Sequence, residues 1–203
     1  MSGATAGGTP EATPETYLAG PGMGIVLLDV NWGRRWSCGG FENAELRRLS
    51  FDRVPPWKSG DEAPADLTLE QPSSLLATPT FTSYALIVEP GQYVMSGFEM
   101  KVARSVSNVL LWAAKRNELI RDGNPQAGSF TVAAGEVVYI GNFWLDCFRS
   151  PQPWRYYTET SEDFRKHIAQ YKDKYPFLRL DKVDYRLFET TRLGRPYSLP
   201  SQP

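Results

Sequence analysis

The stretch from residue 80 to residue 102, TFTSYALIVEPGQYVMSGFEMKV, constrains the fold more than any other part of the sequence. Its first half is rich in β-branched and aromatic residues and has the length of one strand. Pro90 and Gly91 then interrupt it with the chemistry of a type II turn, since proline presets φ and glycine accepts a positive φ. From Phe98 to Val102 every second residue is apolar, as in a strand with one buried face. The pattern predicts a β-hairpin.

A second pair of β-prone runs occupies residues 130–147, FTVAAGEVVYIGNFWLDC. Phe130 and Val132 alternate with smaller residues, and a longer β-prone run follows Gly135. Glycine suits a tight turn at this point because it tolerates positive φ. A phosphate-binding loop would instead carry further glycines and lead into a helix. We therefore predict a hairpin turn at Gly135 rather than a phosphate site.

The rest of the sequence predicts one helix and further strands. The helix is expected at residues 161–175, because Thr160 or Ser161 supplies an N-cap and Pro176 stops it. One apolar stripe runs along this helix and consists of Phe164, Ile168, Tyr171 and Tyr175. Strands are expected at residues 24–30, 45–54 and 178–187, loops at 34–40 and 55–79, and residues 106–120 are ambiguous.

These elements predict a mainly β fold: a β-sandwich with one C-terminal amphipathic helix packed on it and a polar tail. The expected divisions are a disordered linker at 1–22, a β-sandwich domain at 23–158, a helix at 159–180 and an extended tail at 181–203. The linker begins MSGATAGGTPEATPET, a composition with too few apolar residues to join a core.

Two segments, ALIVEPGQYVMSGFEM and SFTVAAGEVVYIGNF, resemble parts of domains found in bacterial lipoproteins and envelope proteins. The shared features are a strand followed by Pro-Gly-x-Tyr and, later, Ala-Gly-Glu-x-x-Tyr-Ile-Gly. Those domains are loosely similar to the transthyretin-like or carboxypeptidase-regulatory-like β-sandwich. The resemblance covers residues 24–147 and the helix that follows. It implies a non-enzymatic β-domain in the periplasm or at the outer membrane of the cell envelope, with no catalytic residues.

Charge and hydropathy exclude some classes of partner. The net charge of the 203 residues is -1, so the chain has no general attraction to nucleic acid. No apolar run approaches the ~20 residues of a membrane span. The first residues have neither the basic nor the apolar segment of a signal peptide. Two interpretations stay open: Met1 replaces a removed signal peptide and a lipidated cysteine that anchored the domain, or the segment is an ordinary disordered N-terminus.

Cys38 and Cys147 are the only cysteines in the sequence. In an oxidising compartment they would form one disulfide that closes a long loop. In a reducing cytosol they would be two buried or half-buried thiols. The sequence leaves this choice open.

A hydrolase is the rival to a non-catalytic domain. Cys38 and His167 are the one pair able to form a thiol–imidazole nucleophile, yet the local signatures of cysteine hydrolases are absent. Paired carboxylates for glycoside hydrolysis would come from Asp29, Glu136, Asp146, Glu162 and Asp163. The alternative is that such acids form ion pairs with Arg34, Arg35 or Arg149. No metal site and no cofactor motif is expected, since His167 is the lone histidine.

Aromatic and arginine side chains gather in two places and form a candidate binding rim. The first group is Trp32, Arg34, Arg35 and Trp36, and the second is Trp154, Tyr156 and Tyr157. Tryptophan, tyrosine and arginine dominate the hot spots of interfaces, although the same side chains also fill cores. A disulfide between Cys38 and Cys147 would make the two groups neighbours.

We therefore expect an envelope-associated accessory protein that binds another protein through this rim and carries out no catalysis. A further alternative is a structural subunit of a larger assembly, in which the tail after Leu180 becomes ordered only on docking.

Overall fold

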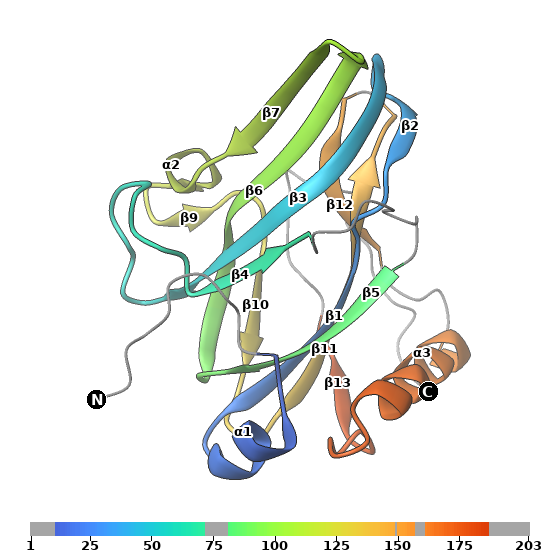
Figure 1. Cartoon of the computed structure of the whole chain (residues 1–203). Coiled ribbons are helices and arrows are strands. Elements are labelled where there is room, and N and C mark those ends of the chain that lie inside the picture. Colours follow the sequence, from blue (N-terminus) through green and yellow to red (C-terminus); the bar gives the residue numbers. More distant parts are fainter. Residues whose placement is uncertain (1–10, 72–80, 149, 157–160, 187–203) are drawn as a thin grey trace.

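The computed structural model describes residues 11–71, 81–148, 150–156 and 161–186. They form two β-sheets packed face to face, with α3 lying against one of them (Figure 1). The predicted fold class, mainly β with a C-terminal helix, is confirmed.

The helices are α1 (Pro14–Ala19), α2 (Arg116–Leu119) and α3 (Ser161–Lys174). The strands are β1 (Gly24–Asn31), β2 (Arg35–Cys38), β3 (Phe41–Val54), β4 (Leu67–Glu70), β5 (Phe81–Val88), β6 (Gly91–Ser105), β7 (Asn108–Ala114), β8 (Ile120–Arg121), β9 (Asn124–Pro125), β10 (Ser129–Val132), β11 (Val137–Asp146), β12 (Gln152–Tyr156) and β13 (Val183–Tyr185).

The two main sheets, here called sheet A and sheet B, differ in how their strands are connected. Sheet A has the order β12-β11-β1-β5, and β13 also pairs with β11. Its central strand β1 runs parallel to β11 and antiparallel to β5. Sheet B has the order β10-β6-β3-β2, with β4 beside β3 and β7 beside β6. The long strand β6 pairs with β10 near its start and with β7 over its second half.

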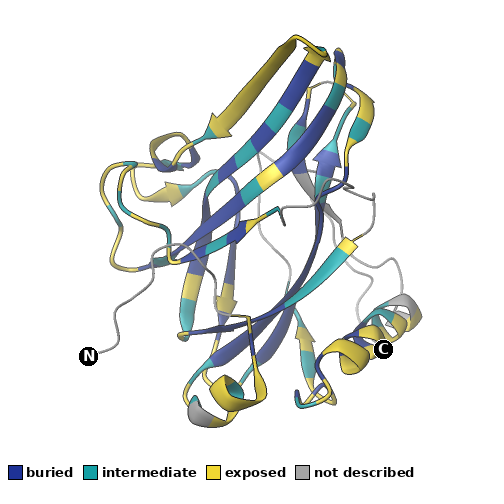
Figure 2. Cartoon of the chain, in the orientation of Figure 1, coloured by how far each residue is buried: buried dark blue, intermediate teal, exposed yellow. Residues whose placement is uncertain are grey.

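Strand β1 is buried at all of its positions because both faces of sheet A are covered (Figure 2). Val26, Leu28 and Val30 point into the core between the sheets. Ile25 and Leu27 point the other way, into a second apolar cluster that includes residues of α3. A continuous apolar run, rather than alternation, is what a strand buried on both faces requires.

Helix α3 confirms the predicted amphipathic helix. Ile168 and Tyr171 lie buried in the second cluster, and Phe164 packs against it half-buried. The stripe continues just beyond the helix to Tyr175, which is 3% exposed and donates its hydroxyl hydrogen to the carbonyl of Ser83 on β5 at 3.1 Å. The apolar stripe therefore packs α3 against the outer face of sheet A.

Both predicted hairpins are wrong, because each pair of strands belongs to two different sheets. The chain passes from β5 in sheet A to β6 in sheet B at Pro90. It passes from β10 in sheet B back to β11 in sheet A at Gly135, which has the expected positive φ of 72°. The amide of Gly135 donates to the carbonyl of Met23 at 2.8 Å, so this turn is bound to the start of sheet A.

The predicted linker also differs from the structure over residues 11–22. Glu11 forms a β-bridge with Leu86, Ala12 is buried, and α1 begins after the N-cap Thr13. The side chain of Thr13 accepts from the amide of Thr16, and Pro14 stands in the first turn, where its missing N–H costs nothing. Residues 1–10 lie outside the described residues.

Two predicted loops contain short strands: β2 lies within the expected loop at 34–40, and β4 lies within the loop at 55–79. The strand expected at 178–187 is present as β13, which spans Val183–Tyr185 at the start of the expected tail and pairs parallel with β11. The ambiguous residues 106–120 contain β7, α2 and the first residue of β8. Tail residues 187–203 lie outside the described residues.

Candidate protein-binding surface

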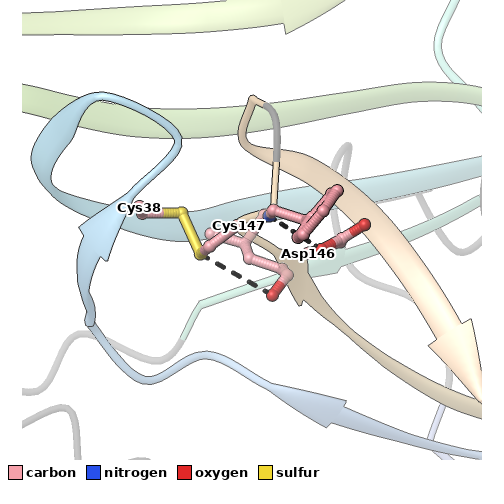
Figure 3. Close-up of a disulfide and its surroundings, with 5 residues drawn as sticks. Cys38, Asp146 and Cys147 are labelled. Atoms are coloured by element: carbon pink, nitrogen blue, oxygen red, sulfur yellow. Dashed lines mark hydrogen bonds between the residues drawn. A yellow bond between two sulfur atoms is a disulfide. The ribbon is translucent and has the colours of Figure 1, made fainter.

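A disulfide joins the two sheets at one end of the sandwich (Figure 3). Cys38, at the end of β2, bonds to Cys147, which directly follows β11, with a Cα–Cα distance of 4.4 Å. The amide of Gly39 donates to the carbonyl of Cys147 at 3.0 Å, so the backbones also meet. Of the two possibilities that the sequence left open, disulfide or free thiols, the structure shows the disulfide, and this bond makes β2 and the end of β11 neighbours.

Trp36 is the most exposed tryptophan described, at 62%. It lies on the outer face of β2, opposite Asn43 of β3. The guanidinium of Arg34 lies 5.5 Å from the centre of its ring. Arg34 is held in turn by Glu45, whose carboxylate is 2.5 Å from its Nε although Glu45 itself is only 4% exposed. A buried acid thus positions an arginine over an exposed indole.

Arg35 connects β2 to β11, the strand that pairs with the strand of the second predicted group. Its guanidinium lies 5.0 Å from the ring centre of Trp144 on β11. Trp144 stands opposite Trp154 in the pairing of β11 with β12. The side chains of Trp154 and Tyr156 and the whole of Tyr157 lie outside the described residues. Arg34, Arg35, Trp36 and Trp144 are called the Trp36 rim below.

Trp32 does not belong to this rim. It continues the inward alternation of Val30 and is 4% exposed, in the core between the sheets. Its Nε1 donates to the hydroxyl of Tyr84 at 2.8 Å. Burial is the main reason that the pKa of Tyr84 is raised above its usual value, and the bond from Trp32 acts in the opposite direction. The sequence predicts that Trp32 contacts a binding partner, and the structure instead places it in the core.

The disulfide overturns the proposed thiol–imidazole pair, since Cys38 has no free thiol. His167 instead lies on α3 and contacts Asp29 of β1, with 2.5 Å between Nε2 and Oδ2. Asp29 is 1% exposed and His167 half-buried. Beside them the hydroxyl of Tyr139 donates to Asn142 at 2.5 Å. Burial, followed by the charge of Asp29, raises the pKa of Tyr171 well above its usual value.

The other candidate acids whose side chains are described, Glu136, Asp146 and Glu162, are dispersed rather than paired, and the side chain of Asp163 lies outside the described part of the structure. Glu136 accepts from Arg186 and from the amide of Ala133, Asp146 accepts from the amide of Phe148, and Glu162 pairs with Lys166. The expected arginine partners Arg34 and Arg35 hold neither Asp29 nor Asp146, and Arg149 lies outside the described residues. Within the described residues, no group of three potential ligands is arranged to hold a metal ion.

Gly135 and Glu136 line an open pocket of about 450 Å³ between α1, the start of sheet A and the segment after α3. Its walls combine apolar Met23, Ile25 and Ile87 with charged Arg179 and Lys182. The carboxylate of Glu136 is already bound on both oxygens, by Arg186 and by the amide of Ala133, so Glu136 is a structural acid in this pocket.

Strand β7 forms a further surface that the sequence patterns did not predict. Val109, Leu110, Leu111 and Trp112 are all at least 36% exposed on this strand. A short apolar run is normally a core strand, and periodicity alone does not separate a core strand from an exposed edge. Only the position of β7 beyond the covered part of sheet B makes its apolar side chains accessible.

No described helix is long and apolar enough to cross a membrane. Comparison with known proteins gives no assignment: no family model, no curated protein and no solved structure matches this chain.

Proposed function

We propose that this chain is a non-catalytic, envelope-associated accessory protein that binds another protein through the Trp36 rim. The observation that carries the proposal is the exposed indole of Trp36, stacked under an arginine that the buried Glu45 holds in place. Such an arrangement resembles the anchors of interfaces, where tryptophan and arginine supply most of the binding energy.

The rim is suited to binding because its parts are already ordered. The disulfide fixes β2 to β11, and Arg35 stacks on Trp144 from the other sheet. Side chains that are held before binding lose less conformational entropy when a partner arrives. Each exposed cation–π contact contributes only about 0.5–1 kcal/mol, so its main effect is to orient the rings.

The proposed compartment rests on the disulfide. Disulfides persist outside the reducing cytosol, in secreted, periplasmic and surface proteins. A bond between Cys38 and Cys147 supports an extracytoplasmic address. The cell envelope is the finer part of the proposal, and it agrees with the resemblance of the two strand segments to envelope domains.

Site-specific crosslinking tests the proposal. A photoreactive amino acid replaces Trp36 in cells that produce the protein, and the crosslinked protein is identified by mass spectrometry. The dissociation constant of that partner is then measured for the wild type, Trp36→Ala and Trp57→Ala. Trp57 is a matched control, because it is also exposed, at 43%, but lies in the loop after β3.

The proposal expects Trp36→Ala to weaken binding at least tenfold, the size of a modest hot spot, and Trp57→Ala to leave it unchanged. Equal affinities of the wild type and Trp36→Ala would refute the role of the rim. Failure to crosslink from position 36, with efficient crosslinking from position 57, would refute it as well.

A further inference from the structure

Strand β7 is an exposed apolar edge. All its positions from Asn108 to Ala113 are exposed, and Ala114 is half-buried (Figure 2). Leu111 is the most accessible of its large side chains, at 62%. Among the described residues β7 pairs with β6 alone, so the backbone groups of its other edge face no strand.

This edge lacks the features that normally protect an edge strand. Natural edges carry charged side chains, prolines or bulges that prevent pairing with another chain. β7, with the sequence NVLLWAA, has no charge and no proline. Its register with β6 runs without interruption from Ala114 to Val109, and the one irregularity lies beyond, near Ser105. A regular, neutral, apolar edge of this kind is a template for strand addition.

We propose that β7 pairs antiparallel with β7 of a second copy of this chain, about a two-fold axis at Leu111. Sheet B of one copy would then continue into sheet B of the other. A closed two-fold contact uses the same surface patch on both copies, so that patch must be complementary to itself. The sequence of β7 meets this condition.

The self-match holds on both faces of the strand. About the axis, Leu111 faces Leu111 of the second copy, Leu110 faces Trp112, and Val109 faces Ala113. Directly opposed residues lie on the same face and contact each other. Every central pair is therefore apolar on apolar, without any change of register.

The pairing with β6 shows which surfaces these pairs would extend. Leu110 and Trp112 stand opposite Val102 and Met100, both of which are buried in the core between the sheets. Trp112 already packs edge-on against Phe41, with 4.9 Å between ring centres. The contact in the dimer would thus continue the existing core of sheet B.

Charge favours a second copy over a charged partner strand. The nearest charged side chain on the outer face is Lys101, opposite Leu111 on β6. In the dimer the two Lys101 residues would be three strand spacings apart, roughly 14 Å. That exceeds the screening length of about 8 Å at physiological ionic strength, so their repulsion is weak. A partner strand with charged side chains opposite Leu111 and Val109 would place those charges against apolar side chains.

The Trp36 rim remains available in this dimer. In the half of sheet B that contains β7, the strand order is β7-β6-β3-β2, so β2 lies at the opposite edge. The dimer would carry two rims, and its formation does not depend on the protein partner proposed above.

Sedimentation velocity over a range of concentrations tests the dimer. The wild type should shift from monomer to dimer, and Leu111→Lys should remain monomeric at every concentration because it places two like charges at the axis. Leu18→Lys is the matched control, since Leu18 is 80% exposed on α1, and it should dimerise as the wild type does. Circular dichroism of each variant checks that the fold is intact.

A cysteine pair tests the register. Leu111→Cys should form an intermolecular disulfide, because the opposed Cβ atoms would be about 4.5–5.5 Å apart. Asn108→Cys should not, since the two positions would be offset by roughly 20 Å along the strands. The native cysteines do not interfere, because they are bonded to each other.

A wild type that stays monomeric, a dimer that persists in Leu111→Lys, or equal crosslinking of both cysteine variants would overturn the proposal. A monomer whose β7 is instead occupied by a strand of another protein, seen by crosslinking from position 111 to a different chain, would overturn it too.

Discussion

His167 on α3 and Asp29 on β1 lie in contact across the outer face of sheet A, with 2.5 Å between Nε2 and Oδ2. Asp29 is opposite Asn142 of β11 and Ser83 of β5, in the middle of the sheet. An acid buried at 1% exposure needs a partner, because removal of a carboxylate from water is costly. The lone histidine of the chain is thus a structural residue that ties the helix to the sheet.

Replacement of His167 by alanine should lower the free energy of unfolding by roughly 3–5 kcal/mol, since it leaves the buried Asp29 without its ion-pair partner. Lys166→Ala is the control on the same helix. Its ion pair with Glu162 is 2.8 Å long with both side chains 68% exposed, and such a pair contributes only about 0.5 kcal/mol. Urea unfolding measures both variants.

The double variant Asp29→Asn/His167→Ala tests the cause. It should recover part of the stability lost in His167→Ala, because the unpaired charge is gone. If His167→Ala costs no more than Lys166→Ala, the contact has no structural role.

A second buried ion pair organises the loop between β3 and β4. Arg116 is 7% exposed, and its Nε lies 2.6 Å from Asp52. Its guanidinium also donates to the carbonyls of Gly60 and Ala63 in that loop. Arg116→Met should therefore lower the free energy of unfolding by roughly 3–5 kcal/mol, because it leaves the buried Asp52 with the more distant Lys58 as its one cationic partner among the described residues.

Exposed Arg121 provides the control, and Arg121→Met should change stability by less than about 0.5 kcal/mol. Hydrogen exchange should also show faster exchange in residues 60–66 of Arg116→Met. Unchanged exchange there would mean that the loop is held by other contacts.

Much of the fold follows from local patterns in the sequence. The sequence predicts β1 and α3 correctly because their apolar residues recur with different spacings. A strand buried on both faces is a continuous apolar run, and a helix buried on one face has an apolar residue every three or four positions. The sequence also predicts the turn at Gly135 correctly, because a positive φ is a local property of the backbone.

Local sequence patterns do not determine which strands pair with each other. A turn at Pro90 or Gly135 reverses the chain equally well within one sheet or between two sheets, and only the burial of whole faces decides. The same limit applies to the site, because Trp32 and Trp36 lie in the same short segment and local patterns do not distinguish them. In the structure Trp32 continues the core face of β1, whereas Trp36 lies on an outer face.

Alkaline pH should destabilise the protein through Tyr93. Burial raises the pKa of this tyrosine to about 12, and its hydroxyl donates to the carbonyl of Glu89 at 2.8 Å. An unfolded tyrosine ionises near pH 10. Between pH 10 and about 12 the unfolded chain therefore loses the proton that the folded chain keeps, and stability falls as pH rises. Below pH 10 this contribution is constant.

Tyr93→Phe should reduce the slope of unfolding free energy against pH above pH 10, while it costs about 1 kcal/mol at neutral pH through the lost hydrogen bond. Unfolding in urea at pH 8, 10 and 11 makes the comparison. Parallel slopes for the wild type and the variant would show that Tyr93 ionises alike in both states.

Loss of the disulfide should weaken both the fold and the Trp36 rim. Cys38 and Cys147 are separated by 109 positions, and closure of a loop of that length stabilises a protein by roughly 4–5 kcal/mol in the chain-entropy model. The double variant Cys38→Ala/Cys147→Ala should be less stable by about that amount. A reductant should destabilise the wild type in the same way and leave the variant unaffected, which provides the internal control.

The rim can be followed separately by trypsin. Arg34 and Arg35 are held by Glu45 and Trp144 while β2 is bonded to β11. Without the bond, β2 is an edge strand with a short pairing to β3, and it should open more often. Cleavage after Arg34 and Arg35 should then accelerate relative to cleavage after the exposed Arg121. Equal acceleration at all three sites would mean that the disulfide stabilises the whole domain without ordering the rim in particular.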